Sequence, residues 1–314
     1  MRIVVTGAAG FIGSSLCREL LAGGHDVTGI DAFTDYYPRW IKERNIAALR
    51  GRPGFELLEE DLDAMDLAPV LAGADAVFHL AAQAGVRASW GRSFDIYTRN
   101  NIQVTQKLLE ASRDLGLKKF VHASSSSVYG LTPVLPMAET NPVQPLSPYG
   151  VSKLAAEHLC FLYFKNFGVP AVSLRFFTVY GPSQRPDMAF HKFFKAIAED
   201  REFVVFGDGR QTRDFTFVAD IVRANLAALD SGRPGETYNI GGGHRRTLAD
   251  VIRVMEGVSG AAARIRWADR QKGDVPDTWA DIAKARRDLD YSPRTELEDG
   301  LRQEWLWVRE LYSS

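Results

Sequence analysis

A chain of 314 residues, with 46% hydrophobic and 25% charged residues, has the composition of a globular protein with a substantial core. Its formal net charge of −1 excludes a global positive field for nucleic acid or an acidic membrane surface. The sequence begins on a strand-like MRIVVTG rather than a signal peptide, and no apolar run reaches membrane-spanning length. The two cysteines, Cys17 and Cys160, are expected to be buried thiols, which favours a reducing compartment and a cytoplasmic protein.

Short β-branched runs alternate with helical patterns through the first half of the chain. The predicted strands are Ile3–Val5, Val27–Ile30, Ala76–Leu80, Phe120–Ala123 and Ala171–Arg175. The predicted helices are Ser14–Ala22, Ile102–Leu115 and Tyr149–Phe167. This alternation predicts an α/β fold of the Rossmann type, a doubly wound parallel sheet with helices on both faces.

Beyond residue 176 the pattern loosens into shorter helices and loops rich in glycine, proline and arginine. We therefore predict a Rossmann dinucleotide-binding domain over residues 1–176 and a smaller C-terminal α/β lobe for substrate over residues 177–314. A strand-like stretch near 237–241 is expected to rejoin the main sheet. A single merged domain is the alternative that the sequence leaves open.

The first predicted strand runs into TGAAGFIG, which places Gly7, Gly10 and Gly13 at the turn before the first helix. Such glycines allow a tight turn and close approach of a pyrophosphate, and the helix N-terminus supplies amides and a partial positive charge. Asp31 follows at the end of the second strand, where a carboxylate accepts from the adenosine ribose diol and repels a 2′-phosphate. These features together predict bound NAD rather than NADP, whereas the glycines alone would fit an ordinary turn.

Further residues are expected along the same cofactor groove. Asp61 and Leu62 are predicted to end the third strand beside the adenine, and Leu80, Ala81 and Ala82 to follow the fourth. Taken singly, these stretches also fit ordinary strand ends and core alanines. The predicted cofactor set is completed by Phe11, Ile12 and Asn100.

The stretch YGVSK opens the long predicted helix and places Tyr149 and Lys153 on one helix face. An ammonium group near a phenol favours the phenolate and draws its pKa down from about 10. The phenolate could then take a hydroxyl proton while hydride leaves the carbon for nicotinamide. Tyrosine and lysine are common on helix surfaces, so the pattern gains its weight from the serine-rich strand end Ser124–Ser127 that precedes it.

Together these motifs resemble the extended short-chain dehydrogenases/reductases, the group of nucleotide-sugar epimerases, dehydratases and decarboxylases. The resemblance covers essentially the whole chain and rests on TGAAGFIG, HLAA, SSSSVYG, YGVSK, RFFTVYGP, GDGRQTRDFTFV, YNIGGG and GDVPDTWAD. Dehydratases of the group typically carry Thr-Asp-Glu before VYG, and UDP-glucuronate decarboxylases Thr-Ser-Glu, whereas this chain carries Ser125-Ser126-Ser127. The missing carboxyl group leaves the epimerase pattern, in which the resemblance implies that Ser125 relays the proton between the substrate O4 and Tyr149.

The stretches RPDMA at 185–189 and HLAAQAGVR at 79–87 resemble those of UDP-glucuronate 4-epimerases. A uronic acid carries a carboxylate at C6, for which Arg185 can supply a forked, charge-assisted contact. Ser126, Ser127 and Thr178 are the expected neutral donors beside it. The alternative is that Arg185 caps a loop or contacts phosphate.

The same matching implies the contacts of the nucleotide. Arg213 corresponds to the diphosphate-binding arginine, Phe206 to the residue against uracil, and Asp274 to the acceptor for the uridine ribose. Arg270 lies where the family often places a second phosphate contact, although RQKGD leaves the register of that contact open. The predicted substrate set is completed by Arg87 and Val204.

The activity that the resemblance implies is NAD-dependent 4-epimerisation of UDP-glucuronate to UDP-galacturonate through a transient 4-keto sugar. It also implies a homodimer, with no metal site, nucleic-acid partner or membrane partner. Three alternatives stay open at this point: a neutral UDP-sugar 4-epimerase acting on UDP-glucose or UDP-N-acetylglucosamine, a UDP-glucuronate decarboxylase, and a non-catalytic NAD-binding protein.

Overall fold

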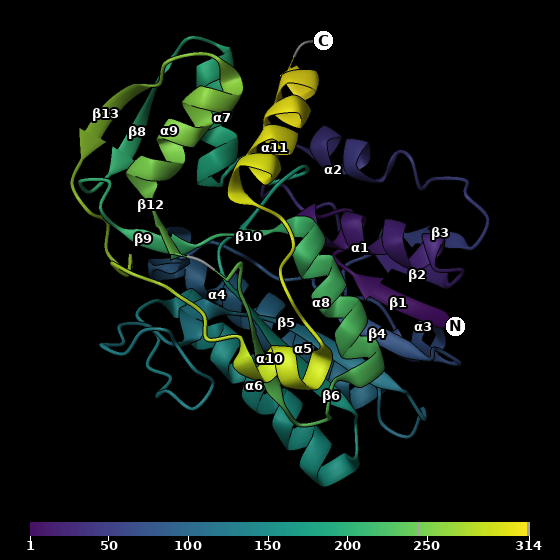
Figure 1. The fold of residues 1–314 in the computed structure, drawn as a ribbon. Helices are drawn as coiled ribbons and strands as arrows, with labels where there is room; N and C mark the ends of the chain where they lie inside the picture. Colours follow the sequence, from purple (N-terminus) through teal and green to yellow (C-terminus); the bar gives the residue numbers. More distant parts are fainter. Residues whose placement is uncertain (244, 313–314) are drawn as a thin grey trace.

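The computed structural model describes residues 1–243 and 245–312. A seven-stranded sheet in the order β11-β6-β5-β4-β1-β2-β3 runs through the centre of the molecule, and all its neighbouring strands are parallel (Figure 1). The chain order reverses between β1 and β4, so the carboxyl ends of these strands form the crevice in which doubly wound sheets bind ligands. The predicted Rossmann-type fold is therefore confirmed. The strands are β1 Arg2–Thr6, β2 Asp26–Ile30, β3 Phe55–Leu58, β4 Ala76–His79, β5 Lys119–Ser125, β6 Ala171–Phe176 and β11 Thr237–Ile240.

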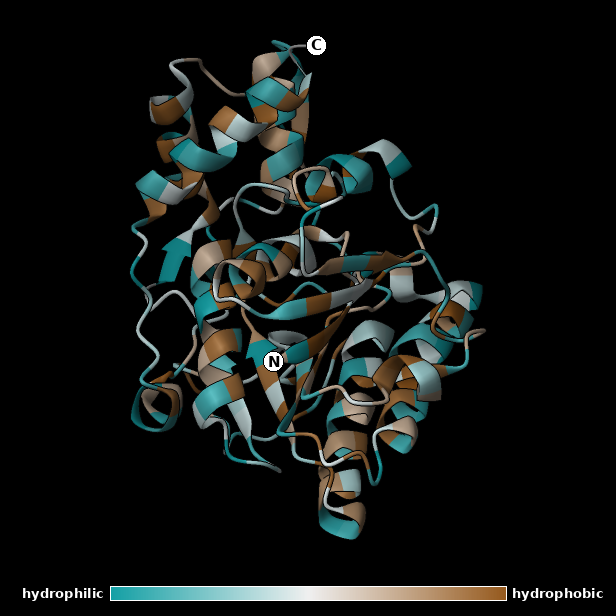
Figure 2. Ribbon diagram, turned by 90° about the vertical axis from the view of Figure 1, so that its right-hand side faces the viewer, coloured by the Kyte–Doolittle hydropathy of each residue, from teal (hydrophilic) through white to brown (hydrophobic). Residues whose placement is uncertain are grey.

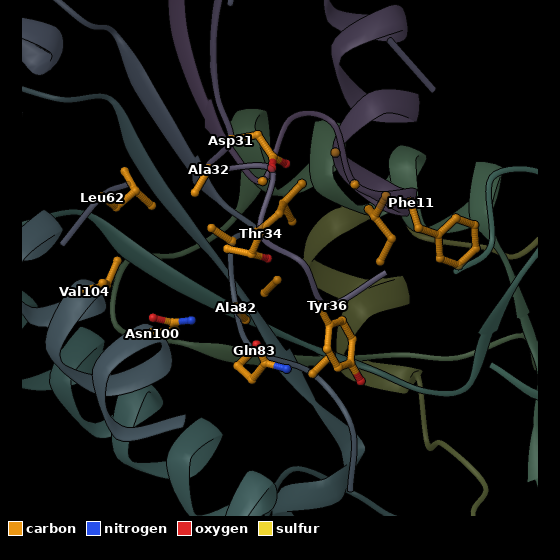
Figure 3. Close-up of a pocket in the computed structure, with 18 of the residues that line it drawn as sticks. Phe11, Asp31, Ala32, Thr34, Tyr36, Leu62, Ala82, Gln83, Asn100 and Val104 are labelled. Atoms are coloured by element: carbon orange, nitrogen blue, oxygen red, sulfur yellow. The ribbon is translucent and has the colours of Figure 1, made fainter. Parts of the chain in front are cut away.

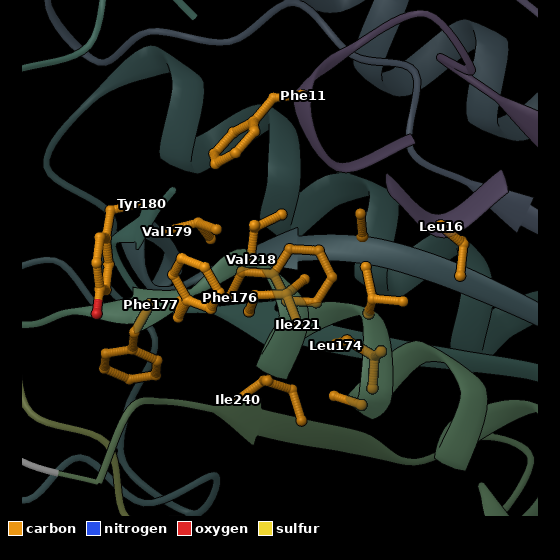
Figure 4. Close-up of a cluster of buried hydrophobic side chains, with 14 of the residues drawn as sticks. Phe11, Leu16, Leu174, Phe176, Phe177, Val179, Tyr180, Val218, Ile221 and Ile240 are labelled. Atoms are coloured by element: carbon orange, nitrogen blue, oxygen red, sulfur yellow. The ribbon is translucent and has the colours of Figure 1, made fainter. Parts of the chain in front are cut away.

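Helices cover both faces of this sheet, and the pleat of the strands divides the core between them. Ile3 and Val5 of β1 join one buried cluster, whereas Val4 joins the other, because successive side chains of a strand point to opposite faces. Figure 4 shows part of the first cluster, in which Phe11 and Ile221 pack beside residues of β6 and β11. In Figure 2 the helices alternate between hydrophilic and hydrophobic segments, as expected when only one stripe faces the core. The first face carries α1 Phe11–Ala22, α8 Val218–Ser231 and α10 Ala283–Leu289; the second carries α3 Leu67–Leu71, α5 Val104–Ala111 and α6 Pro148–Phe167.

The sequence encodes both ends of α6, the helix that carries the predicted catalytic pair. Ser147 caps its start, since its hydroxyl accepts from the Gly150 amide at 3.1 Å, and Pro148 occupies the first turn. The helix ends at Gly168, whose φ of 70° is left-handed. A well-defined first turn of this kind fixes where residues 149–153 lie relative to the sheet.

A second lobe lies beside the carboxyl ends of the sheet, at the upper left of Figure 1. Its strands β8 Glu202–Phe206 and β13 Arg264–Ala268 pair in parallel. Two smaller strand pairs join β9 Thr212–Asp214 to β12 Arg245–Thr247 and β10 Thr216–Phe217 to β7 Val179–Tyr180. Its packed helices are α7 Ala189–Ala198, α9 Leu248–Ser259 and α11 Leu297–Tyr312.

The two halves of the chain are interleaved. β11 pairs with β6 at the edge of the main sheet, and α8 packs against α1 and β5 of the first half. The predicted division at residues 176/177 stays a prediction, because part of the second half completes the Rossmann layers.

Some predicted element bounds are wrong. β3 ends at Leu58, so Asp61 and Leu62 lie beyond the strand, in a turn where the Asp63 amide donates to the Asp61 carboxylate at 2.9 Å. β4 ends at His79 rather than Leu80. The helix predicted over 102–115 begins as a π-helical segment at Thr98–Gln103, continues as α5 and ends at Ala111.

Among residues 1–243 and 245–312, no helix is both long and apolar enough to cross a membrane.

Candidate active site

The glycine turn between β1 and α1 is packed too closely for any side chain. A Cβ on Gly13 would lie 2.0 Å from the Gly7 carbonyl oxygen, and one on Gly7 would lie 2.9 Å from the Ala81 amide nitrogen. Gly7 also has a φ of 71°, which favours glycine. The backbone of this turn and the N-terminus of α1 therefore face the crevice bare, as close approach of a pyrophosphate requires.

Asp31, at the end of β2, is fixed before any ribose reaches it. Its Oδ2 accepts from the Ala9 amide at 3.1 Å, and its Oδ1 accepts from the Phe33 amide at 2.9 Å. The Lys42 ammonium of α2 (Arg39–Ile46) adds a buried ion pair at 2.8 Å. Lys42 was not predicted, because only the folded chain brings a lysine of the next helix onto this carboxylate.

All the predicted cofactor residues line one cavity of about 240 Å³, from Gly7 at the turn to Lys153 on α6. Figure 3 shows Leu62, Asn100 and Val104 on one side of this cavity and Phe11 on the other. Bare backbone at one end, an anchored carboxylate and an apolar slot fit a dinucleotide. The walls that sequence reasoning missed include Thr34, Tyr36, Lys42, Gln83 and Arg99.

Tyr149 and Lys153 of α6 line this cavity where it meets β5. Ser125 lies close enough to the Tyr149 hydroxyl to act on its pKa, and the Lys153 ammonium donates to the Ala123 carbonyl at 2.8 Å. Burial lowers the pKa of Lys153 to about 8. Burial raises the pKa of Tyr149, and Ser125 and the positive charge of Arg185 oppose that rise. Desolvation is the largest effect on the Tyr149 pKa, and the cation that opposes it is Arg185. The expected effect of Lys153 on this pKa stays a prediction.

A second cavity of about 540 Å³ lies between the sheet and the second lobe, and most predicted substrate residues line it. The Arg87 guanidinium pairs with Asp274 at 2.6 Å and lies 4.4 Å from the centre of the Phe206 ring. Arg213 donates to the carbonyl oxygens of residues 275 and 276, which fixes its guanidinium. The predicted substrate residues on this wall are Arg87, Thr178, Arg185, Phe206, Arg213, Arg270 and Asp274.

Four predicted substrate residues lie outside the walls of both cavities: Ser125, Ser126, Ser127 and Val204. Ser126 and Ser127 belong to a short 3₁₀ turn that follows β5, and both are half-buried. Val204 is half-buried on β8, in register with Arg266 of β13. The structure therefore brings Ser125 to Tyr149 but leaves the next two serines one turn further on.

Arg185 and Tyr36 line both cavities and so mark the place where the two meet. Arg185 forms a two-point ion pair with Asp187, with Nε–Oδ1 at 2.9 Å and Nη2–Oδ2 at 3.0 Å. The Tyr36 hydroxyl donates to Asp187 Oδ2 at 3.2 Å. Asp187 stands inside the RPDMA motif, but its part in the site could not be read from the sequence.

Comparisons with known proteins identify the family of the chain. The model of the NAD dependent epimerase/dehydratase family matches residues 3–241. The chain is 48% identical over 316 residues to the uncharacterized UDP-glucose epimerase YtcB of Bacillus subtilis (strain 168), covering 99% of both chains. It is 38% identical over 315 residues to the UDP-glucuronate 4-epimerase of Thermodesulfobacterium geofontis (strain OPF15), covering 98% of this chain and 96% of that one.

A crystal structure of the UDP-glucuronic acid 4-epimerase from Bacillus cereus, in complex with UDP-glucuronic acid and NAD, superposes with a TM-score of 0.97. That protein is 48% identical, and the match covers 99% of this chain and 100% of that one. With the glycine turn, Asp31 and the Ser125–Tyr149–Lys153 arrangement in place, the chain belongs to the NAD dependent epimerase/dehydratase family.

Proposed function

We propose that the protein is an NAD-dependent UDP-glucuronate 4-epimerase, which interconverts UDP-glucuronate and UDP-galacturonate. The observation that carries this proposal is the position of Arg185 where the two cavities meet, close enough to Tyr149 for its charge to act on the phenol. A cation at this point faces the sugar end of a nucleotide sugar whose diphosphate lies in the arginine-rich second cavity. The UDP-glucuronate 4-epimerases of Thermodesulfobacterium geofontis and Bacillus cereus support the same substrate.

The proton chemistry is assigned to Tyr149, Ser125 and Lys153. Tyr149 takes the O4 proton of the sugar through Ser125. NAD, held by the glycine turn, Asp31 and Lys153, would supply the acceptor and donor of the C4 hydride. Lys153 is an ammonium below a pKa of about 8, so it adds positive charge to the floor of the site at neutral pH. The 4-keto sugar turns about its diphosphate link and presents its other face, and the returned hydride inverts C4.

The nucleotide contacts are assigned to the second cavity, with Arg213 and Arg270 at the diphosphate, Phe206 against uracil and Asp274 at the uridine ribose. Arg87 covers the Phe206 ring and pairs with Asp274. Bound uridine would take the place of Arg87 at both Phe206 and Asp274. Binding therefore requires Arg87 to leave these two residues and to contact the phosphate instead. Arg87 is half-exposed, which makes this exchange inexpensive.

The 4-keto uronate is a β-keto acid, and it can lose carbon dioxide when its carboxylate rotates into overlap with the ketone. Arg185 and Thr178, both on the cavity wall, are placed to hold that carboxylate out of alignment. The chain has Ser127 where the decarboxylases of the group carry glutamate. These features favour epimerisation over decarboxylation.

The direct test is to incubate purified protein with UDP-glucuronate, without added NAD, and to resolve the nucleotide-sugar products. We expect UDP-galacturonate. The variant Arg185→Ala should lose most of this turnover, whereas Arg266→Ala, which breaks an exposed ion pair on β13, should keep it. An Arg185→Ala enzyme as fast as the wild type would contradict the carboxylate assignment, and UDP-pentose as the main product would indicate a decarboxylase.

A neutral-sugar epimerase is the second candidate, because the Bacillus subtilis relative carries the name of a UDP-glucose epimerase at 48% identity. The same incubation with UDP-glucose separates the two. Faster conversion of UDP-glucose than of UDP-glucuronate would favour this candidate over the uronate epimerase.

We also propose that the enzyme is a cytoplasmic homodimer. The exposed face of α6 is apolar, with Val151 46% and Leu162 46% exposed, and Ile96 of α4 (Phe94–Tyr97) is 43% exposed. α4 and α5 pack against α6, so their outer faces together form one surface that a second copy could cover. The cytoplasmic location is supported by two free, buried cysteines, which suit a reducing compartment.

A further inference from the structure

Asp187 occupies only one edge of the Arg185 guanidinium. The carboxylate binds Arg185 side-on, through Nε at 2.9 Å and Nη2 at 3.0 Å. A guanidinium carries donors along more than one edge, so a side-on partner leaves the Nη1–Nη2 edge with donors of its own. That edge has the geometry for a second, end-on carboxylate.

Tyr36 is a second partner of Asp187. Its hydroxyl donates to Oδ2 at 3.2 Å, and its ring lies 5.8 Å from the Arg185 guanidinium. Tyr36 comes from the loop that follows Asp31, and it lines the cofactor cavity as well as the second cavity. In Figure 3 its hydroxyl points away from Asp31, and Gln83 lies nearby.

We infer that Asp187 and Tyr36 are positioning residues, which fix Arg185 so that its free edge meets the C6 carboxylate of the sugar. The inference rests on the proposed function and identifies the residues that hold Arg185 ready for a sugar that bears a carboxylate. An arginine that is already held loses little rotamer freedom when the sugar binds. More of the free energy of the Arg185–carboxylate contact therefore contributes to the affinity for the sugar. The charge of Asp187 also offsets that of Arg185, so an empty site does not carry an unpaired buried cation.

This arrangement has a consequence for the 4-keto intermediate. Decarboxylation breaks the C5–C6 bond and releases carbon dioxide; the bond's electron pair forms an enolate with the ketone, and the enolate takes a proton at C5. The carboxylate must first rotate out of its hydrogen bonds. An Arg185 fixed by Asp187 opposes this rotation, whereas an unheld Arg185 can follow the carboxylate as it turns.

The test compares Asp187→Asn with the wild type, because asparagine keeps the size of the side chain and removes its charge. We expect the KM for UDP-glucuronate to rise about tenfold. The share of turnovers that release carbon dioxide should rise several-fold, measured with substrate labelled at C6. The inhibition constant of UDP-glucose, which has no carboxylate, should change by less than about twofold.

Tyr36→Phe is the milder variant, since it removes only the donated hydrogen bond, and it should shift both quantities in the same direction by less. The matched control is Glu199→Gln, which breaks the exposed Arg201–Glu199 pair of the same sequence spacing and should change none of them.

Several outcomes would overturn the inference. One is that Asp187→Asn keeps the wild-type KM and carbon dioxide release; another is that it weakens UDP-glucose and UDP-glucuronate equally, which would indicate a general structural role. If Asp187→Asn does not fold, Tyr36→Phe decides by the same criteria. A wild-type enzyme that fails to convert UDP-glucuronate contradicts the proposed function instead, so the two failures are distinguishable.

Discussion

At the scale of single residues, the cofactor preference depends on an ion pair as well as on a carboxylate. Asp31 carries two backbone amides and the Lys42 ammonium, and Lys42 lines the same cavity. The carboxylate holds the Lys42 ammonium, and we expect it also to accept from the adenosine ribose diol. Replacing Asp31 changes both properties at once.

We predict that Asp31→Asn weakens NAD about 10- to 100-fold, because the ribose loses a charge-assisted acceptor. The same change releases Lys42 towards a 2′-phosphate, so NADP should weaken less than NAD or even bind more tightly. Titration of the cofactor-free variant with both dinucleotides measures this. An unchanged ratio of the two affinities would contradict the role given to Lys42.

Tyr149→Phe should lower kcat by roughly 10²- to 10⁴-fold, the usual contribution of a positioned acid–base group. The ring and the Lys153 bond to Ala123 are unaffected by this change, so bound NAD and the melting temperature should stay near those of the wild type. Rapid-quench assays, with cofactor content measured in parallel, check both. A variant with more than about a tenth of the wild-type kcat would require a different base.

Every cofactor residue that the motifs predicted lines the cavity, but the motifs missed other parts of its wall and most of the supporting network. Gly7, Asp31 and Tyr149 sit in motifs whose spacing, taken together with the neighbouring predicted strands, implies a role. Asp187 and Lys42 act through partners far along the chain or across a turn, and no local pattern marks such contacts. The substrate roles of Ser125, Ser126 and Ser127 stay predictions, because none of the three lines either cavity.

At the scale of elements, the parallel strands β4 and β5 carry two buried histidines close to Lys153. His79 is 1% exposed and hydrogen-bonds with Thr6 and Thr105 at 2.8 and 3.0 Å. Burial, with a smaller contribution from the charge of Lys153, lowers the pKa of His79 to about 3. The pKa of the neighbouring His122 is lowered well below its usual range for the same reasons.

These histidines predict a loss of stability in acid. Between pH 6.5 and about 3 an unfolded His79 is protonated while the folded one stays neutral, so the unfolded state binds more protons. The free energy of unfolding should therefore fall as the pH is lowered through this window. Urea unfolding at several pH values measures the slope. His79→Gln should flatten it, and the control His25→Gln should not; equal slopes in wild type and His79→Gln would contradict the prediction.

The types of element were predictable from sequence, but their ends were not. α6 has a serine cap and a terminal glycine, and its predicted range of 149–167 is close to that observed. The segment 98–111 carries no such signals, and its π-helical start depends on packing against α4 and α6. β3 ends early because the Asp61 side chain forms its own turn.

At the scale of the whole molecule, the second half of the chain both completes the sheet and covers the ligand crevice. β11 and α8 belong to the Rossmann layers, whereas α7, α9 and the β8–β13 pair form the lobe above the second cavity. The strand-like stretch near 237–241 is the one expected to rejoin the sheet, and β11 at Thr237–Ile240 pairs with β6. The outer face of α6 stays open in the single chain.

We predict that this face pairs two copies, so that sedimentation of the wild type gives the mass of two chains. Leu162→Asp should shift the protein towards a single chain, since a charge on an apolar interface is costly to bury. Leu306→Asp, on the 56% exposed Leu306 of α11, is the control and should leave the mass unchanged. A wild type that sediments as one chain, or a Leu162→Asp dimer as stable as the wild type, would contradict this interface.

The central claim is that C4 is inverted by removal and return of one hydride within a single bound sugar. The most direct measurement uses UDP-glucuronate deuterated at C4, incubated in ordinary water and analysed by NMR. The account predicts UDP-galacturonate with the deuterium still at C4 and no label in water. Loss of that deuterium during conversion would contradict this mechanism. So would a failure of the enzyme to convert the deuterated substrate.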